Sequence, residues 1–155
     1  MDTQAETQVN AVTIFTIGFT KKNAQSFFEA LQQAGVTRVV DIRLNNESQL
    51  AGFTKKADLP YFLKVIAGID YVHRPALAPT KEILDGYKKK RLNWAEYERL
   101  FLALLDQRRP EMLLTPAEMD KACLLCGEPK AEKCHRRLVA EYLQSKWPGV
   151  QVQHL

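Results

Sequence analysis

The 155-residue sequence has no apolar run of the roughly 18 to 20 residues that a membrane-spanning helix needs. Its first ten residues, MDTQAETQVN, are polar and show neither the basic region nor the apolar region of a secretion signal. We therefore expect a cytoplasmic protein without membrane association. We also expect a short disordered lead-in over residues 1–10, followed by a single domain over residues 11–155.

Cysteine is scarce, since the sequence holds three, all between positions 123 and 134. An odd, clustered set makes a poor disulfide framework and favours a reducing compartment. The sequence contains neither GxGxxG nor GxxxxGK followed by Ser or Thr, so it has no dinucleotide fingerprint and no P-loop, and any cofactor stays unknown. The formal net charge of +4 permits an anionic partner without requiring a nucleic acid.

Short β-rich segments alternate with longer amphipathic ones along the chain. The sequence predicts strands at residues 13–18, 37–42, 70–74, 122–126 and 150–154. The order of elements is typical of α/β proteins, in which crossover helices join parallel strands. We therefore expect a mostly parallel sheet of about five strands with helices on both faces, in a Rossmann-like layering.

Helix boundaries are marked by familiar signals. Gly35 follows an apolar stripe and predicts a helix end, and Asp58 precedes the next stripe as a possible cap. Asn93 and Glu96 have the spacing of a capping box, and they precede the best helical stripe in the chain. Pro110 is expected to end that helix.

Polar residues follow the first two predicted strands at their carboxyl ends, where ligands of such sheets bind. Gly18 and Thr20 lie at a strand-to-helix turn, where backbone N–H groups can approach an anion. Asp41 and Arg43 are two residues apart, so both side chains point to one face. Arg43 is a candidate to hold a phosphate or carboxylate, with Asp41 orienting it. A simple Asp–Arg ion pair and a plain capping role for Thr20 are the structural alternatives.

The stretch ACLLCGEPKAEKCHRRLVAEYL, residues 122–143, carries the strongest candidates for chemistry. Cys126 ends a predicted strand, and Cys134 lies at the start of a helix, where the helix dipole stabilises a thiolate. Either thiol is a candidate nucleophile or half of a redox pair, with Glu128 or His135 as a proton carrier. Arg136 at a helix start is opposed by the dipole, which indicates an anion nearby. The alternative is that both thiols are buried apolar groups.

A metal site is not favoured by this stretch. Cys123 is predicted to be buried inside a strand, and a structural zinc site usually has a second well-spaced ligand pair. Adjacent Cys134 and His135 on a helix would point roughly 100° apart. The basic run at residues 88–91 is expected to be a solvated helix end, with a phosphate contact as the alternative.

Several motifs resemble domain-of-unknown-function family 488 across nearly the whole chain. They are TIGFT (16–20), VVDIR (39–43), NNESQLAGF (45–53), DLPYFL (58–63), LAPTKEIL (77–84) and, most specific, CLLCGEPKAEKCHRRLVAEYL (123–143). The resemblance implies an α/β fold and a role for Arg43, Cys126, Glu128, Cys134, His135 and Arg136, but it brings no reaction. Many members carry a GHS-like first turn, and because this chain has Gly-Phe-Thr there, a histidine role is not carried over.

The sequence thus predicts an anion pocket at the strand carboxyl ends, for a nucleotide or phosphorylated metabolite, with possible thiolate chemistry. The arginines would bind the anion. Two alternatives remain open: a nucleic-acid-associated module using the basic run and the loop at 45–56, and a structural metal-binding protein. The sequence sets neither the reaction nor the oligomeric state.

Overall fold

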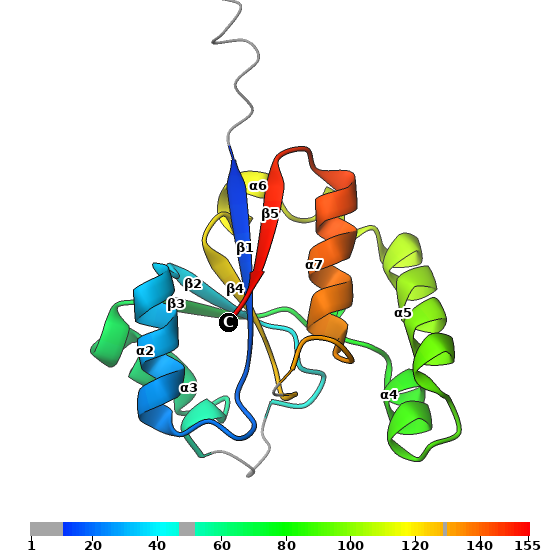
Figure 1. Cartoon of the computed structure of the whole chain (residues 1–155), viewed down its shortest axis with the longest axis horizontal. Helices are drawn as coiled ribbons and strands as arrows, with labels where there is room; N and C mark the ends of the chain where they lie inside the picture. The colour runs from blue at the N-terminus through cyan, green and yellow to red at the C-terminus, as the bar shows by residue number, and fades with distance from the viewer. Residues whose placement is uncertain (1–10, 47–51, 129) are drawn as a thin grey trace, which may run out of the picture.

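The computed structural model describes residues 11–46, 52–128 and 130–155 of the chain. Its centre is a five-stranded, all-parallel sheet in the order β3-β2-β4-β1-β5 (Figure 1). The strands are β1 Val12–Gly18, β2 Arg38–Asp41, β3 Asp70–His73, β4 Ala122–Cys126 and β5 Val150–His154. The predicted α/β class is confirmed, and each predicted strand end lies within one residue of the observed one. The predicted lead-in and part of the predicted loop at 45–56 lie outside the described residues.

Helices cover both faces of the sheet, as expected (Figure 1). One face carries α2 (Ala24–Ala34) and α3 (Leu59–Phe62), which a turn of π-helix continues over Leu63–Ala67. The other carries α4 (Lys81–Lys88), α5 (Trp94–Arg108), α6 (Pro116–Met119) and α7 (His135–Lys146). Among the described residues, no helix is long and apolar enough to cross a membrane.

The predicted boundaries at Gly35 and Asn93 are present as hydrogen-bonded caps, whereas Asp58 stands at the N-cap position of α3 without a side-chain cap hydrogen bond. Gly35 ends α2 in the left-handed region, with φ of 80°, which glycine adopts without strain. Asn93 accepts a hydrogen bond from the Glu96 backbone at the start of α5, and the Glu96 side chain accepts one from the Asn93 N–H. Helix α5 ends at Arg108, two residues before Pro110. Helix α6 has no counterpart in the sequence prediction.

Alternating residues of β1 divide the core into two layers. Ile14 belongs to the apolar cluster shared with α5 and α7, whereas Phe15 and Ile17 belong to the cluster shared with α2. This alternation follows from the two-residue period of a strand. Both layers are closely packed, so the sheet is a rigid base from which the strand ends project.

The order of the strands creates a crevice at their carboxyl ends. Strand β4 lies between β1 and β2. The chain leaves β1 and β2 toward helices on one face, but it leaves β4 toward α7 on the other. Ligands of open parallel sheets bind at such a switch point, because the diverging connections leave space between them.

Candidate functional site

A cavity of about 760 Å³ lies at this switch point, and we call it the strand-end cavity. It is bounded by the turns after β1, β2 and β4, by the start of α7, and by the hairpin between α4 and α5. Of the nine side chains singled out in the sequence, six line it: Thr20, Arg43, Cys126, Glu128, Cys134 and His135. The other three, Gly18, Asp41 and Arg136, are not among the residues that line it.

Cys126 and His135 form a directed pair in this cavity. Cys126 is the last residue of β4 and His135 the first of α7, which places Nδ1 of the imidazole 3.4 Å from the sulfur. The other ring nitrogen, Nε2, is 2.7 Å from the carbonyl oxygen of Ile42. A carbonyl can only accept a hydrogen bond, so Nε2 carries a proton and Nδ1 faces the sulfur. The Ile42 carbonyl therefore fixes the ring orientation and requires a proton on Nε2.

The surroundings of Cys126 favour the thiolate form of its side chain. A hydrogen bond from the Cys134 thiol and the positive charge of His135 hold the pKa of Cys126 well below its usual value, against the effect of burial. Burial and the neighbouring Cys126 raise the pKa of Cys134. Burial alone would lower the pKa of His135, but the Cys126 thiolate outweighs it and raises this pKa. Both pKa shifts favour a thiolate on Cys126 beside a protonated imidazole on His135.

Cys123 provides a contrast within the same strand. It is completely buried in the core beside α2 and is not among the residues that line the strand-end cavity. Burial raises its pKa, so its thiol stays protonated. The sequence prediction of a core role for Cys123 agrees with this position.

Cys134 is the N-cap residue of α7, with an extended backbone at φ −138° and ψ 142°. The angle of roughly 100° expected between consecutive helical side chains therefore does not apply to Cys134 and His135. Their ligand atoms and the Cys126 sulfur lie within 4.8 Å of one another. Two thiols and one imidazole are a donor set that zinc accepts, with one position left open. The hydrogen bond from Nε2 to a carbonyl is common in metal-bound histidines as well.

Arg43 is held in a fork-to-fork ion pair with Asp41. Its Nε and Nη2 donate to the two carboxylate oxygens over 2.9 and 2.8 Å, and Nη2 also donates to the Thr54 carbonyl over 2.6 Å. The Tyr71 hydroxyl donates to the same carboxylate. The third nitrogen, Nη1, is buried and has no hydrogen-bond partner among the described residues. The ion-pair alternative is therefore present, and one donor remains unused beside the cavity.

Arg136 is buried, with 1% of its surface exposed. Its Nε donates to the Thr16 hydroxyl over 3.2 Å, and its Nη1 donates to the carbonyl of Glu128. That carbonyl crosses directly over Gly18, where a Cβ atom would stand 2.6 Å from the carbonyl carbon of Glu128. Arg136 thus fixes the turn after β4 against β1, and the missing side chain of Gly18 permits this contact.

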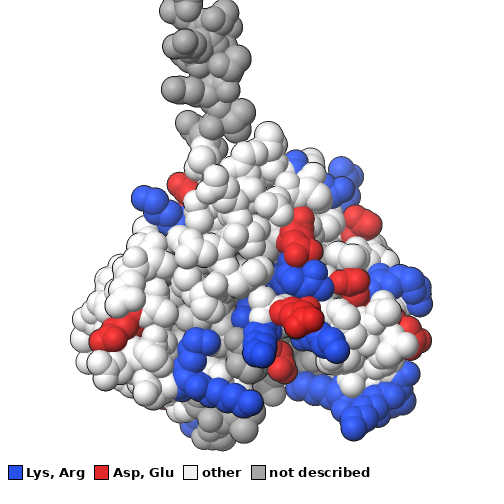
Figure 2. All heavy atoms as spheres, viewed as in Figure 1, with Lys and Arg blue, Asp and Glu red and all other residues white. Residues whose placement is uncertain are grey.

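Aromatic and basic side chains from the α4–α5 hairpin complete the strand-end cavity, and sequence reasoning missed their role. They include Tyr87, Trp94 and Tyr97, together with Lys88 and Lys90. The sequence shows the basic run directly. The aromatic residues have the helical spacing of a core stripe, so the sequence alone predicts that they pack in the core and gives no sign that they line a cavity. Figure 2 shows lysine and arginine side chains along the lower edge of the molecule, toward which the strand carboxyl ends point.

The family model described as "Domain of unknown function DUF488" matches residues 23–143 of the chain. The matched range includes Arg43, Cys126, Glu128, Cys134 and His135, and it leaves Thr20 outside. No curated protein and no solved structure matches the chain.

Proposed function

The chain belongs to the DUF488 family, whose description states no reaction, and we propose that it is an enzyme with Cys126 as nucleophile. Its substrate in this proposal is an anionic small molecule, a nucleotide or another phosphorylated metabolite, bound in the strand-end cavity. We thus propose both that the Cys126 thiolate reacts and that the cavity prefers an anionic ligand.

One observation carries the proposal: the chain of contacts from the Cys126 sulfur through the His135 imidazole to the Ile42 carbonyl. A nucleophile, a base and a group that orients the base are the three parts of an activated-nucleophile site. Cys126 and His135 both line a cavity of about 760 Å³, which lies within the usual size range of small-molecule sites. A buried structural thiol such as Cys123 needs none of these features.

The geometry supports a two-step group transfer. The Cys126 sulfur forms a bond to an electrophilic carbon or phosphorus atom of the ligand, the bond to the leaving group breaks, and the leaving group takes the proton from Nδ1 of His135. A water molecule then gives a proton to His135 while its oxygen displaces the Cys126 thiolate. The net reaction is hydrolysis, and the thiolate–imidazolium pair is restored.

The charges around the cavity support an anionic substrate. Lys88, Lys90 and Lys133 line it with exposed side chains, and Glu128 is the one acidic residue among the described residues that do so. Lysine ammonium groups bind phosphate as point charges, and they also raise the local concentration of an anionic ligand.

The test is alkylation by iodoacetamide between pH 6 and 9, with the modified residue identified by mass spectrometry. We expect Cys126 to react first and to keep reacting below the ordinary cysteine pKa near 8.5, because its own pKa is lowered. Cys123 should stay unmodified in the folded protein, and a Cys123→Ala variant should behave as the wild type. Labelling of Cys126 at pH 6.5 no faster than in the urea-unfolded chain would refute the nucleophile role.

Two further measurements bear on the reaction. Incubation with a pool of nucleotides and phosphorylated metabolites should consume at least one of them with the wild type and none with Cys126→Ser. Elemental analysis of freshly purified protein should find no stoichiometric zinc. One zinc per chain would make Cys126, Cys134 and His135 metal ligands and would overturn the proposal in favour of a metal centre.

A further inference from the structure

We infer that the ligand of the strand-end cavity is a nucleoside phosphate, with its base stacked on the aromatic side chains of the α4–α5 hairpin and its phosphate at the hairpin lysines. This inference rests on the proposed function and narrows its substrate class. It does not depend on whether Cys126 reacts, so the two can fail separately.

The hairpin presents a compact aromatic surface. The rings of Tyr87, Trp94 and Tyr97 contact one another, with centroid distances of 5.6 Å for Tyr87–Trp94, 5.1 Å for Trp94–Tyr97 and 5.0 Å for Tyr87–Tyr97. Tyr97 is buried, whereas Tyr87 and Trp94 are half-buried and line the cavity. Half-exposed rings that a third ring holds in place offer a rigid apolar platform. Such platforms bind planar bases, because every base has a π-face to stack.

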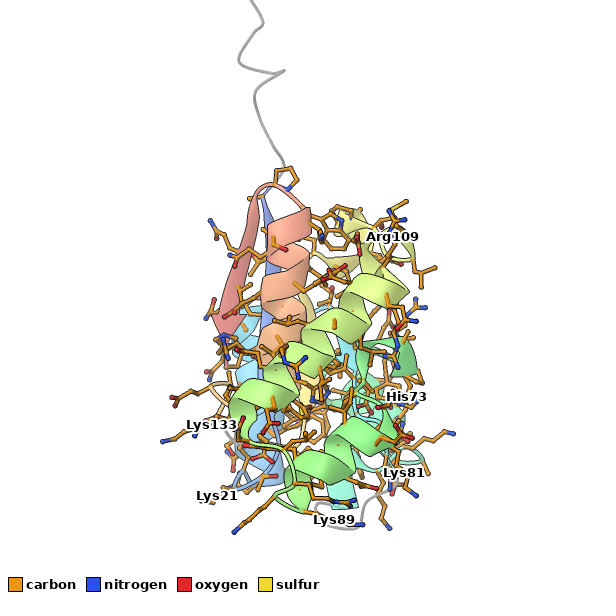
Figure 3. The ribbon with its side chains drawn as sticks, turned by 90° about the vertical axis from the view of Figure 1, so that its right-hand side faces the viewer. Lys21, His73, Lys81, Lys89, Arg109 and Lys133 are labelled. Atoms are coloured by element: carbon orange, nitrogen blue, oxygen red, sulfur yellow. The ribbon has the colours of Figure 1, made fainter. Side chains whose placement is uncertain are left out.

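The cations lie on the same hairpin, on a turn whose backbone is fixed. The N–H of Lys90 donates to the Tyr87 carbonyl, and those of Arg91 and Leu92 both donate to the Gly86 carbonyl. Lys88 ends α4 and Lys90 lies in this ordered turn, and both line the strand-end cavity together with Tyr87 and Trp94. Figure 3 labels Lys89 of this turn and Lys133 of the turn before α7 in the same half of the molecule, away from Arg109.

Arg43 contributes a further donor at the sheet side of the cavity. Its guanidinium is paired with Asp41, stands over the Phe19 ring at 5.2 Å from the ring centroid, and keeps Nη1 without a partner among the described residues. Its side chain is 7% exposed. A buried donor without a partner is costly, so a ligand oxygen within reach would be bound favourably.

The aromatic surface and the cations together distinguish between classes of phosphorylated molecule. A sugar phosphate would use the lysines but has no planar base to stack on the half-exposed rings of Tyr87 and Trp94. A nucleoside phosphate uses both, and Cys126 lines the same cavity as the rings and the lysines. A free nucleotide and a nucleotide at the end of a nucleic-acid strand share this chemistry.

Isothermal titration calorimetry with the full chain tests the inference. Adenosine 5′-monophosphate is the first probe, with adenosine and ribose 5-phosphate as the two half-ligands. We expect the whole nucleotide to bind at least tenfold more tightly than either half. Equal affinity for ribose 5-phosphate would remove the base from the proposal, and equal affinity for adenosine would remove the phosphate.

Three variants locate the binding. Trp94→Leu keeps apolar volume but removes the flat ring, and should weaken nucleotide binding about fivefold or more while leaving ribose 5-phosphate unchanged. Lys88→Gln with Lys90→Gln should weaken both phosphorylated probes and reduce their salt dependence. Lys89→Gln is the matched control, because Lys89 lies between the two on the same turn but does not line the cavity. An equal loss in Lys89→Gln would show that only general charge matters.

A 5′-phosphorylated single-stranded oligonucleotide distinguishes the two sources of the nucleotide. Tighter binding than the free nucleotide, lost in Trp94→Leu, would assign the cavity to a strand end. Weaker binding would assign it to the free molecule. Nucleotide should also slow alkylation of Cys126. If Cys126 is reactive but no nucleotide binds or slows its alkylation, this inference is wrong and the nucleophile role of Cys126 stands. If nucleotide binds but Cys126 is unreactive, this inference stands and the nucleophile role is wrong.

Discussion

Replacing Gly18 by alanine should loosen the turn that holds one wall of the strand-end cavity. The added Cβ would stand 2.6 Å from the carbonyl carbon of Glu128, and closer still to its oxygen and to Arg136. Ordinary carbon contacts start near 3.4 Å, so the carbonyl must retreat by at least about 0.8 Å. The atom in the way belongs to the backbone and cannot rotate aside.

The cost has two parts. Forcing a methyl group into a filled space costs about 1–3 kcal/mol, and losing the hydrogen bond between the Arg136 guanidinium and the Glu128 carbonyl costs about 1.5–3 kcal/mol. Arg136 keeps its bond to Thr16, so a buried charge is not left without any partner. We therefore expect the free energy of unfolding to fall by about 3 kcal/mol.

Urea unfolding at 25 °C measures this change, and the rate of Cys126 alkylation reports on the neighbouring site. Gly52→Ala is the control, since a Cβ there would meet nothing within 4 Å among the described residues. Its free energy of unfolding should stay within about 0.5 kcal/mol of the wild type. A Gly18→Ala protein that also stays within about 1 kcal/mol, with unchanged alkylation, would refute the tight contact between the two turns.

Three smaller changes probe other contacts. His135→Asn removes the positive charge that helps to lower the pKa of Cys126, so the alkylation rate should reach half of its maximum at higher pH; an unchanged pH profile would exclude His135 as the activating group. Tyr71→Phe removes a 2.6 Å hydrogen bond to Asp41 and should lower the free energy of unfolding by about 1 kcal/mol in urea. Asn93→Ala removes the N-cap of α5 and should cost about 1 kcal/mol, visible as a lower thermal midpoint; no loss would mean that the capping box contributes nothing.

The sheet and the helix caps were predictable because they depend on local signals. Strand β4 has five apolar residues in a row and β1 ends in glycine, and both read as strands from sequence alone. Asn93 and Glu96 lie three residues apart, which suffices to predict a capping box without any tertiary contact. Helix α6 was missed because four residues give too short a pattern.

The site was predictable only in part. Parallel strands end at one edge of the sheet, so topology predicts that Arg43 and Cys126 line the same cavity. The position of Cys134 depends on whether it is the N-cap or the first helical residue, a difference of one residue that sequence patterns do not resolve. Trp94 at the start of α5 looks like a packing residue in sequence. Its place in the cavity follows from how the α4–α5 hairpin docks on the sheet, which is a long-range property.

The central position of β4 has a consequence for the newly made chain. Strand β4 pairs with β1 through Ile14 and Ala122, and with β2 through Arg38 and Ala122, so it bridges partners separated from it by most of the sequence. Contacts of such long range form late, because the intervening chain must first be made and ordered. Until β4 has left the ribosome, β1 and β2 lack the strand that lies between them. Until α7 has also left it, Cys126 lacks its partner His135. The Cys126–His135 contact therefore requires that β4 and α7 have both been made and docked, and an incomplete chain lacks the pair on which the proposed nucleophile depends.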